Sequence, residues 1–481
     1  MEDTDICDNK MSLEDCEISL LRHAVDKEEM QQKKNLKNET VDEIISILKE
    51  FMIRRKVICY GGTAINNILP LEDRFYGEEE IPDFDFFSMT PLTDAKTLTN
   101  IYFNKGFHDV ECKAAVHPGT FKVFVNFIPI ADITYLEKTI FKVLMKEVIV
   151  VNKIQYAPPN YLKMSMFLEL SRPEGDISRW EKVFLRLKLL NKHYPFSPHR
   201  SCLKKNTTKK AEEISDNLFE ILVSHDVVFF GGYAFHLYSE FSKRTINKKI
   251  QQNKFIQYDV LSDNVDNMAT SIVQKLKEKD IEASIKNYPA VGEIIPRSAE
   301  IHIDGKTWAS LYEPIACHSY NEVFSETLQK IIKIATINTM LSFYLAFIYV
   351  DLKKYNKNRI LCMAEILFDI EQKHRTETKG ILNQFSIQCF GKQKTIQDIR
   401  TDKLKKFDEL KHHKNSKEYE WWFINYQPKR DGLLQVRHSS HARQSNRTHV
   451  KANKTKKSNH KPRKHPKRHT KKNKILNLIP L

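Results

Sequence analysis

The sequence lacks several features that mark common protein classes. Its eight cysteines include no Cys-x-x-Cys pair, which excludes a zinc ribbon built from paired thiolates and gives no disulfide framework, so we expect reduced thiols in an intracellular compartment. No stretch approaches the ~20 uninterrupted apolar residues that a membrane span needs. The first residues lack the basic and then apolar layout of a signal peptide. We therefore expect neither a membrane protein nor a secreted one.

Acidic residues are absent from one end of the chain, since no Asp or Glu follows Asp431. The chain has 77 basic and 61 acidic residues, a formal net charge of +16, and 15 of the basic residues lie in residues 432–481. The body is thus nearly neutral, whereas the tail is a polycation too polar to bury a core. We expect a disordered tail that binds RNA or DNA phosphates, the alternative being a role in solubility or nuclear import alone.

The rest of the chain has the composition and periodicity of a mixed α/β protein. Its 481 residues, 41% of them apolar, allow two or three domains. Apolar spacing predicts helices and strands in alternation. The expected helices are 41–54, 63–69, 94–104, 161–170 and 177–192, and the expected strands are 57–60, 82–88, 108–115 and 121–135.

The opening pattern returns later in the chain. Residues 227–234 match the strand and Gly-Gly turn of residues 57–64, and residues 257–262 match residues 83–88. We interpret this as an internal duplication that gives two tandem sheet domains. The expected regions are a polar segment 1–40, an active domain 41–157, a helical connector 158–208, a degenerate second domain 209–330, a helical region 331–431 and the basic tail 432–481.

Two carboxylates stand on one side of a predicted strand. Alternation places Asp83 and Asp85 on one face, with Phe84 and Phe86 on the other. Such close carboxylates repel each other unless a cation lies between them, and oxygen ligands favour Mg²⁺ or Mn²⁺. A solvated strand face would show the same pattern, so this pair alone is weak evidence for a metal site.

Two further features strengthen the case. Gly61-Gly62-Thr63 joins a strand to a helix, which allows close approach of the backbone and directs free amides and the Thr63 hydroxyl toward a triphosphate. Asp132 lies in an apolar run, where an acid without a partner would be costly, so we expect a cation beside it. A tight turn and a satisfied strand-end acid are the ordinary alternatives, but the combination is more specific.

These motifs resemble the nucleotidyltransferase superfamily related to DNA polymerase beta. With residues 82–88, the basic segments 171–173 and 179–182, and the second copy, the chain is similar over residues 41–370 to the poly(A) polymerase catalytic subunits of large DNA viruses, of the mimivirus, asfarvirus and poxvirus kinds. The resemblance implies template-independent polyadenylation of mRNA, in which AMP passes from ATP to an RNA 3′ hydroxyl and pyrophosphate leaves. It implies that Asp83 and Asp85 bind both metals and that Asp132 binds one.

The resemblance also implies partners and a location. ATP and an RNA 3′ end would be the ligands, and a second copy or a viral processivity subunit would be the protein partner. The host cytoplasm, at the viral factory, would be the place of action, with the virion as a further one.

The second copy departs from the motif where chemistry needs acids. Gln257 replaces the first Asp, Tyr233 replaces the Thr, and residues 307–312 offer no acid, which leaves Asp259 alone. One carboxylate cannot hold two metals, so we expect an inactive scaffold or an RNA-binding wall.

A basic helical region between the copies is expected to reach the triphosphate or the primer. Its candidates are Lys163, Arg172, Arg179, Lys182 and Arg186, of which the last three share a helix face. Tyr161 and Trp180 are candidates to stack on adenine, the core being the alternative. The predicted nucleotide site is Gly61, Gly62, Thr63, Lys163, Arg179 and Lys182.

Two other functions stay open at this point. One is a different transferase on the same fold, such as a terminal uridylyl- or CCA-adding enzyme, and the other is a non-catalytic RNA-binding scaffold. No residue identifies ATP over UTP as the substrate.

Overall fold

The structure is a computed structural model that describes residues 39–77, 82–196, 209–242, 257–325, 329–350 and 355–428, with a few residues between 12 and 24. The chain divides into a compact unit that ends at Lys429 and a second unit that lies outside the described residues. The predictions for the basic tail and for most of segment 1–40 therefore concern residues outside the description. Within the described ranges, no helix is both long enough and apolar enough to span a membrane.

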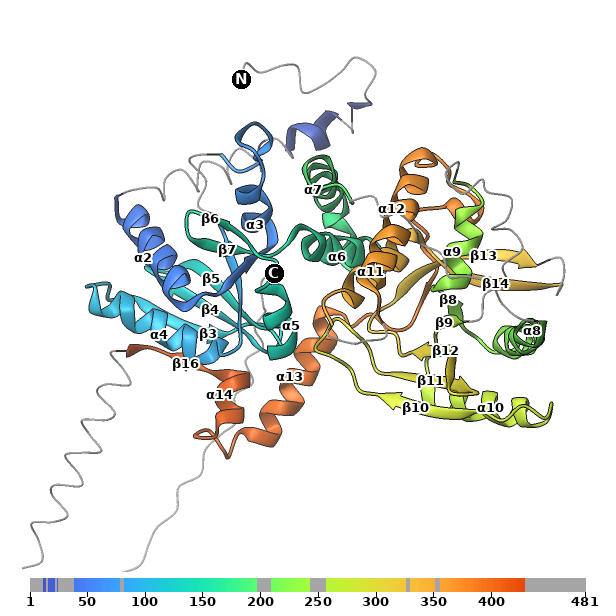
Figure 1. Ribbon diagram of the computed structural model, residues 1–481. Helices are drawn as coiled ribbons and strands as arrows, with labels where there is room; N and C mark the ends of the chain where they lie inside the picture. Colours follow the sequence, from blue (N-terminus) through green and yellow to red (C-terminus); the bar gives the residue numbers. More distant parts are fainter. Residues whose placement is uncertain are drawn as a thin grey trace, which may run out of the picture. The chain divides into compact units, whose positions relative to one another are not determined.

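The first half of the compact unit is built on an eight-stranded mixed sheet (Figure 1), with strand order β16-β3-β4-β5-β2-β1-β7-β6. Its elements are α2 (Glu39–Arg55), β1 (Ile58–Tyr60), α3 (Gly61–Ile68), β2 (Phe84–Ser88), α4 (Pro91–Asn104), β3 (Val110–Ala114), β4 (Thr120–Val125), β5 (Ile128–Tyr135), α5 (Lys138–Leu144), β6 (Ile149–Val151), β7 (Ile154–Tyr156) and α6 (Pro159–Leu170). The helices and the first three strands predicted here are confirmed to within a few residues. The single strand predicted over 121–135 is wrong, because Asn126 and Phe127 adopt positive φ and turn the chain between two antiparallel strands, β4 and β5.

Helices α2 and α4 pack on one face of this sheet through their apolar sides. The ring of Phe51 in α2 lies 6.3 Å from that of Phe86 in β2. Tyr102 of α4 is fully buried and donates its hydroxyl hydrogen to the carbonyl of Ile44, at 2.7 Å. These contacts leave the opposite face of the sheet for polar residues.

That opposite face is less polar than alternation predicts. Phe87 shares it with Asp85, yet Phe87 is buried and stacks on Tyr60 with ring centroids 3.8 Å apart. The prediction of one polar and one apolar face for this strand is therefore wrong at Phe87, because the acids occupy only the end of the strand.

The second half repeats the order of elements. They are α8 (Lys209–Val223), β8 (Val228–Phe229), α9 (Gly232–Ser239), β9 (Tyr258–Leu261), α10 (Val265–Lys277), β10 (Ser284–Tyr288), β11 (Ser298–Ile303), β12 (Lys306–Tyr312), β13 (His318–Ser325), β14 (Lys330–Ala335) and α11 (Ile337–Phe347). Its strand order β10-β11-β12-β9-β8-β14-β13 matches β3-β4-β5-β2-β1-β7-β6, position by position. Each pair of neighbours also has the same parallel or antiparallel sense in both sheets, which supports the predicted duplication.

The helices that follow the last strand of each copy pack against each other. Helix α6 contacts α11, and the rings of Tyr161 and Tyr349 lie 5.3 Å apart. The backbone amide of Ser319 donates to the carbonyl of Ser171 at 2.8 Å. The repeated order thus runs through α6 and α11, across the boundaries predicted at 157/158 and 330/331.

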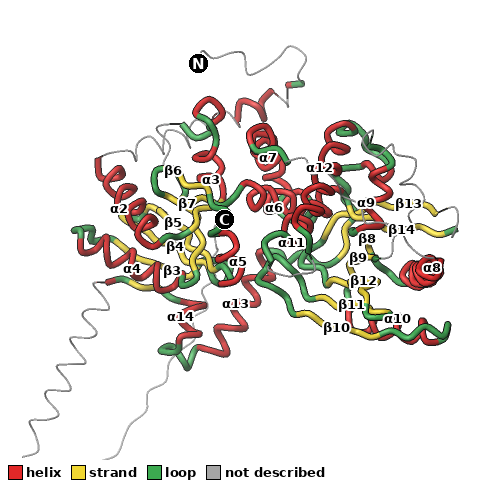
Figure 2. The backbone as a smooth tube through the Cα atoms, viewed as in Figure 1, coloured by secondary structure: helices red, strands yellow, loops and turns green. Residues whose placement is uncertain are grey.

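The region after residue 331 supplies strands as well as helices. Its later helices are α12 (Lys357–Lys373), α13 (Ile396–Leu410) and α14 (Lys417–Phe423). Two short strands join the sheets, β15 (Cys389–Phe390) beside β13 and β16 (Asn425–Tyr426) beside β3. Figure 2 shows the strands in two groups surrounded by helices, and the mixed α/β class is confirmed.

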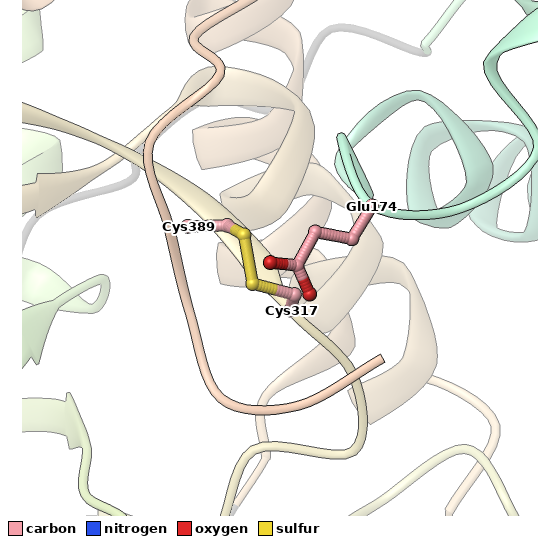
Figure 3. Close-up of side chains that lie close together, drawn as sticks. All are labelled: Glu174, Cys317 and Cys389. Carbon is pink, nitrogen blue, oxygen red and sulfur yellow. A yellow bond between two sulfur atoms is a disulfide. The ribbon is translucent and has the colours of Figure 1, made fainter. Parts of the chain in front are cut away.

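Strand β15 also creates a disulfide. Cys317 and Cys389 are bonded, with Cα atoms 5.1 Å apart, beside Glu174 (Figure 3). The prediction of reduced thiols is wrong for this pair, because the two cysteines are 72 residues apart and only the pairing of β15 with β13 brings them together. Bonded sulfurs offer no thiolate, so this cluster is not a metal site.

Candidate active site

The three predicted acids come together at one end of the first sheet. Strands β2 and β5 are parallel neighbours whose register pairs Asp85 directly with Asp132. Asp83 is exposed, immediately before β2, and lies two residues from Asp85, so it belongs to the same side of the strand. Asp85 and Asp132 are thus direct neighbours in the sheet, although almost fifty residues separate them in the sequence.

Asp85 is the electrostatically strained member of this group. Its pKa is raised to about 7, chiefly by burial and in smaller measure by the neighbouring charges of Asp132 and Asp83. Repulsion of this kind is relieved by a cation among the carboxylates. The donor set consists of carboxylate oxygens, which fits Mg²⁺ or Mn²⁺, and Asp83, Asp85 and Asp132 are the residues that would hold it.

Gly61, the first glycine of the turn, lies close to the carboxylate of Asp85. Gly61 has φ of +70°, and a Cβ added there would lie 2.7 Å from Oδ2 of Asp85. Helix α3 begins at this residue, so its first amides stand at the same end of the sheet as the carboxylates. A side chain at Gly61 would thus both strain the backbone and displace Asp85.

Thr63 does not play the predicted role. Its side chain is fully buried, and its hydroxyl donates to the backbone carbonyl of Asp83. The prediction that this hydroxyl faces a triphosphate is therefore wrong, because the first turn of α3 directs it toward the start of β2. Thr63 instead holds the backbone of Asp83, the first of the three acids.

A cation stands beside the second glycine. A Cβ at Gly62 would lie 3.0 Å from Nη1 of Arg186 in α7 (Trp180–His193). The guanidinium donates to the Tyr76 hydroxyl at 3.2 Å and lies 4.7 Å from the ring centroid of Phe75. An anion bound at the α3 amides would meet this charge. Arg186 belongs to the predicted basic face, although it is not in the predicted nucleotide site.

Of the other basic residues in the predicted nucleotide site, Arg179 and Lys182 are exposed and Lys163 is buried. Arg179 pairs with Glu169 at 3.2 Å, is more than half exposed, and its charge lowers the pKa of Asp85, so it lies near the acids. Lys182 is exposed at the start of α7. Lys163 is fully buried and donates to the carbonyl of Tyr194, and burial lowers its pKa to about 7. The prediction that Lys163 binds nucleotide is wrong, because it faces the interior from α6.

The aromatic residues proposed for adenine stacking pack on protein. Tyr161 is 4% exposed, with its ring 5.7 Å from that of Phe87. The ring of Trp180 lies 5.7 Å from that of Phe385, and its indole N–H donates to the carbonyl of Glu169 at 3.1 Å. The core alternative is therefore the correct one for Tyr161, and Trp180 is held by contacts within the protein.

One residue of the site escaped sequence reasoning. Register places Lys122 of β4 directly opposite Asp132. Its ammonium lies 2.7 and 3.0 Å from the two carboxylate oxygens of Asp132. Alternation along β4 would have assigned Lys122 to a polar face, but only the sheet shows which residue it faces.

The second sheet carries an incomplete version of this site. Asp259 occupies the register position of Asp85, and Ser310 stands opposite it in place of Asp132. The hydroxyl of Tyr344, a buried residue of α11, donates to the carbonyl of Gly231 at 3.3 Å. An aromatic side chain therefore contacts the turn that corresponds to the Gly61 turn of the first sheet, and the acid set is incomplete.

A mixed sheet with carboxylates on two adjacent parallel strands, beside a Gly-Gly turn that opens a helix, is the arrangement expected from the resemblance to nucleotidyltransferases. Comparison with known proteins finds a family model that matches part of the chain. Residues 46–176 match the family model described as "Poly(A) polymerase catalytic subunit". This segment contains the turn and all three acids, so the resemblance predicted from the motifs is confirmed.

Curated relatives agree over the same part of the chain. Proteins provisionally named poly(A) polymerase catalytic subunit from African swine fever virus are 32% identical over 171 residues, which is 34% of this chain and 36% of theirs. The counterpart from Acanthamoeba polyphaga mimivirus is 33% identical over 156 residues, 32% of this chain and 26% of its own length. The alignments thus span about a third of the length of the African swine fever virus proteins and about a quarter of the length of the mimivirus protein.

The fold is shared over a longer range. The crystal structure of the Megavirus polyadenylate synthase superposes with a TM-score of 0.71 and 19% sequence identity, over 93% of each chain. At this identity the match shows a common fold, and it includes both halves of the compact unit.

Proposed function

We propose that the chain is a polynucleotide adenylyltransferase that transfers AMP from ATP to the 3′ hydroxyl of mRNA without a template. The observation that carries this proposal is the adjacency of Asp85 and Asp132 on parallel strands, beside the Gly61 turn and Arg186. The family match over residues 46–176 supports adenylyl transfer over the uridylyl- and CCA-adding alternatives. The complete acid set argues against a purely scaffolding role.

The reaction forms a bond between the RNA O3′ and the α-phosphorus of ATP and breaks the bond from that phosphorus to the bridging oxygen. The hydroxyl proton is released, and pyrophosphate leaves. Bound Mg²⁺ or Mn²⁺, held by Asp83, Asp85 and Asp132, would lower the pKa of the attacking hydroxyl and neutralise the leaving group. Two such ions would be held there, with Asp83 and Asp85 as candidate ligands of both and Asp132 of one.

The chain's own residues supply position and charge around this centre. Thr63 anchors Asp83 through its backbone, and Gly61 allows the carboxylate of Asp85 to approach the turn. The α3 amides and Arg186 form an anion-binding subsite that suits the β- and γ-phosphates of ATP. Arg179 and Lys182 stand on the same helical segment and would extend this positive region toward the RNA backbone.

The second half has a supporting role in this proposal. It lacks the partner acid at Ser310, and Tyr344 contacts its turn, so we assign it no chemical step. By analogy with the viral relatives, we place the protein in the host cytoplasm at the viral factory and in the virion. A second copy or a processivity subunit is the proposed protein partner.

A primer extension assay tests the proposal. The full chain is incubated with a short RNA, Mg²⁺ and each single NTP, and product length is read on a gel. ATP should give long products, and Asp83→Ala or Asp85→Ala should reduce addition by more than about 1,000-fold, because each removes a metal ligand. Asp259→Ala, at the matching position of the second sheet, is the control and should keep wild-type rates. Retained activity in both acid variants would refute the assignment, and extension with UTP alone would redirect it to a uridylyltransferase.

A further inference from the structure

The ion pair between Lys122 and Asp132 uses both oxygens of a carboxylate that is a proposed metal ligand. Both oxygens of the Asp132 carboxylate lie within 3.0 Å of one ammonium group. A divalent cation held by Asp132 would need at least one of these oxygens. The lysine and the cation therefore compete for the same ligand atoms.

Neighbouring residues show that Lys122 is placed for this contact. On the next strand, Lys113 stands directly opposite Lys122 on the same face. The ammonium of Lys113 contacts Glu111 instead, and lies over the ring of Phe124 at 5.4 Å. The charge of Lys122 also lowers the pKa of Asp85, so its field reaches the neighbouring strand β2.

The second sheet provides an internal comparison. Ser310 stands at the position of Asp132, and the residue opposite it on β11 is Glu300, at the position of Lys122. Glu300 is buried and accepts a hydrogen bond from the Tyr288 hydroxyl at 3.2 Å. The sheet that lost the acid thus also lacks the lysine, as expected if the two residues work as a pair rather than as a general feature of the fold.

We propose that Lys122 is an internal counter-ion of the three carboxylates, and that it competes with the divalent cation for Asp132 and sets the metal concentration at which the site fills. The inference rests on the metal site of the proposed function. Without a metal, the lysine offsets repulsion among the acids. If Asp132 held a metal, the ammonium would give up at least one of its two contacts with that carboxylate and would be available to an incoming phosphate.

Metal titration of the full chain tests this proposal without any measurement of catalysis. Mn²⁺ binding is measured by calorimetry, in the absence of RNA and nucleotide, for the wild type and for Lys122→Met. We expect Lys122→Met to tighten Mn²⁺ binding about tenfold, because it removes a positive charge that contacts a metal ligand and repels the cation. Lys333→Met is the matched control, since Lys333 is also a strand lysine paired with an aspartate, Asp226 at 2.5 Å, and should leave the affinity unchanged.

Two further variants make the result specific. Lys122→Arg keeps the charge and should keep near wild-type affinity. In an Asp132→Asn background, Lys122→Met should give no further tightening, because the contested ligand is gone. Thermal unfolding in EDTA verifies that each variant is folded.

The outcomes separate this inference from the function beneath it. If the wild type binds Mn²⁺, Asp85→Asn abolishes binding, and Lys122→Met binds with equal or lower affinity while folded, the counter-ion role is overturned and the metal site stands. If the wild type binds no Mn²⁺, or Asp85→Asn binds as the wild type does, both the metal site and the role of Lys122 are overturned.

Discussion

Asp85 should weaken the folded protein whenever no metal is present. Its pKa is about 7 in the fold, against an ordinary value of 3.8, chiefly because the side chain is buried. Between these two pH values the folded state retains a proton that the unfolded state has lost. Stability therefore falls as pH rises from about 4 to about 7, and stays at the lower level above that range.

The size of the effect follows from the shift. Each pKa unit corresponds to 1.36 kcal/mol, so the shift sets a ceiling of about 4 kcal/mol above neutral pH. The side chain is only half-buried, and relaxation and solvent screening reduce the cost to about 2 kcal/mol. Asp85→Asn, which carries no charge, should thus raise the melting temperature at pH 8 in EDTA by roughly 2–5 °C.

Thermal melts from pH 5 to 8.5 in EDTA measure this difference. The gap between Asp85→Asn and wild type should grow up to about pH 7 and then level off. Added Mn²⁺ should reverse the order, because it stabilises only the protein that can bind it. Asp280→Asn, at an exposed position, is the control and should match the wild type at every pH. An Asp85→Asn variant no more stable than wild type at pH 8 would refute the electrostatic argument.

Three further predictions follow from the site and the tail. Gly61→Ala should lower activity more than about 100-fold, because the added methyl group displaces Asp85. Gly106 also has positive φ but has open space around it, so Gly106→Ala should lower stability without lowering activity. Equal activity losses of the two variants in steady-state assays would contradict this. Arg186→Met should raise the KM for ATP about tenfold, with little change in kcat, if the charge binds ATP equally in the ground and transition states; a loss confined to kcat would contradict that role. Deletion of residues 432–481 should weaken RNA binding and make the affinity depend less steeply on salt concentration, because 15 basic residues are removed. Titration of a labelled oligonucleotide at several salt concentrations measures this dependence for both proteins. Identical slopes of affinity against salt would mean that residues 1–431 alone bind the primer.

The local features of the active site were accessible from the sequence. The Gly61 turn and the Asp83 and Asp85 pair follow from strand alternation and from glycine at a strand end, which are properties of neighbouring residues. The incomplete acid set of the second copy was equally visible, because Gln257 stands at the position matched to Asp83. Asp132 was identified because an acid in an apolar run needs a partner.

Contacts between distant segments were decided only by the tertiary structure. The sequence does not state that β4 lies beside β5, so it could not pair Lys122 with Asp132. Helical periodicity did not show that Lys163 faces the interior, because a lysine is normally assigned to the exposed side of a helix. The disulfide between Cys317 and Cys389 likewise depends on β15 joining β13. Periodicity assigns residues to faces, whereas the choice of neighbouring strand and helix depends on packing between parts of the chain that no local pattern connects.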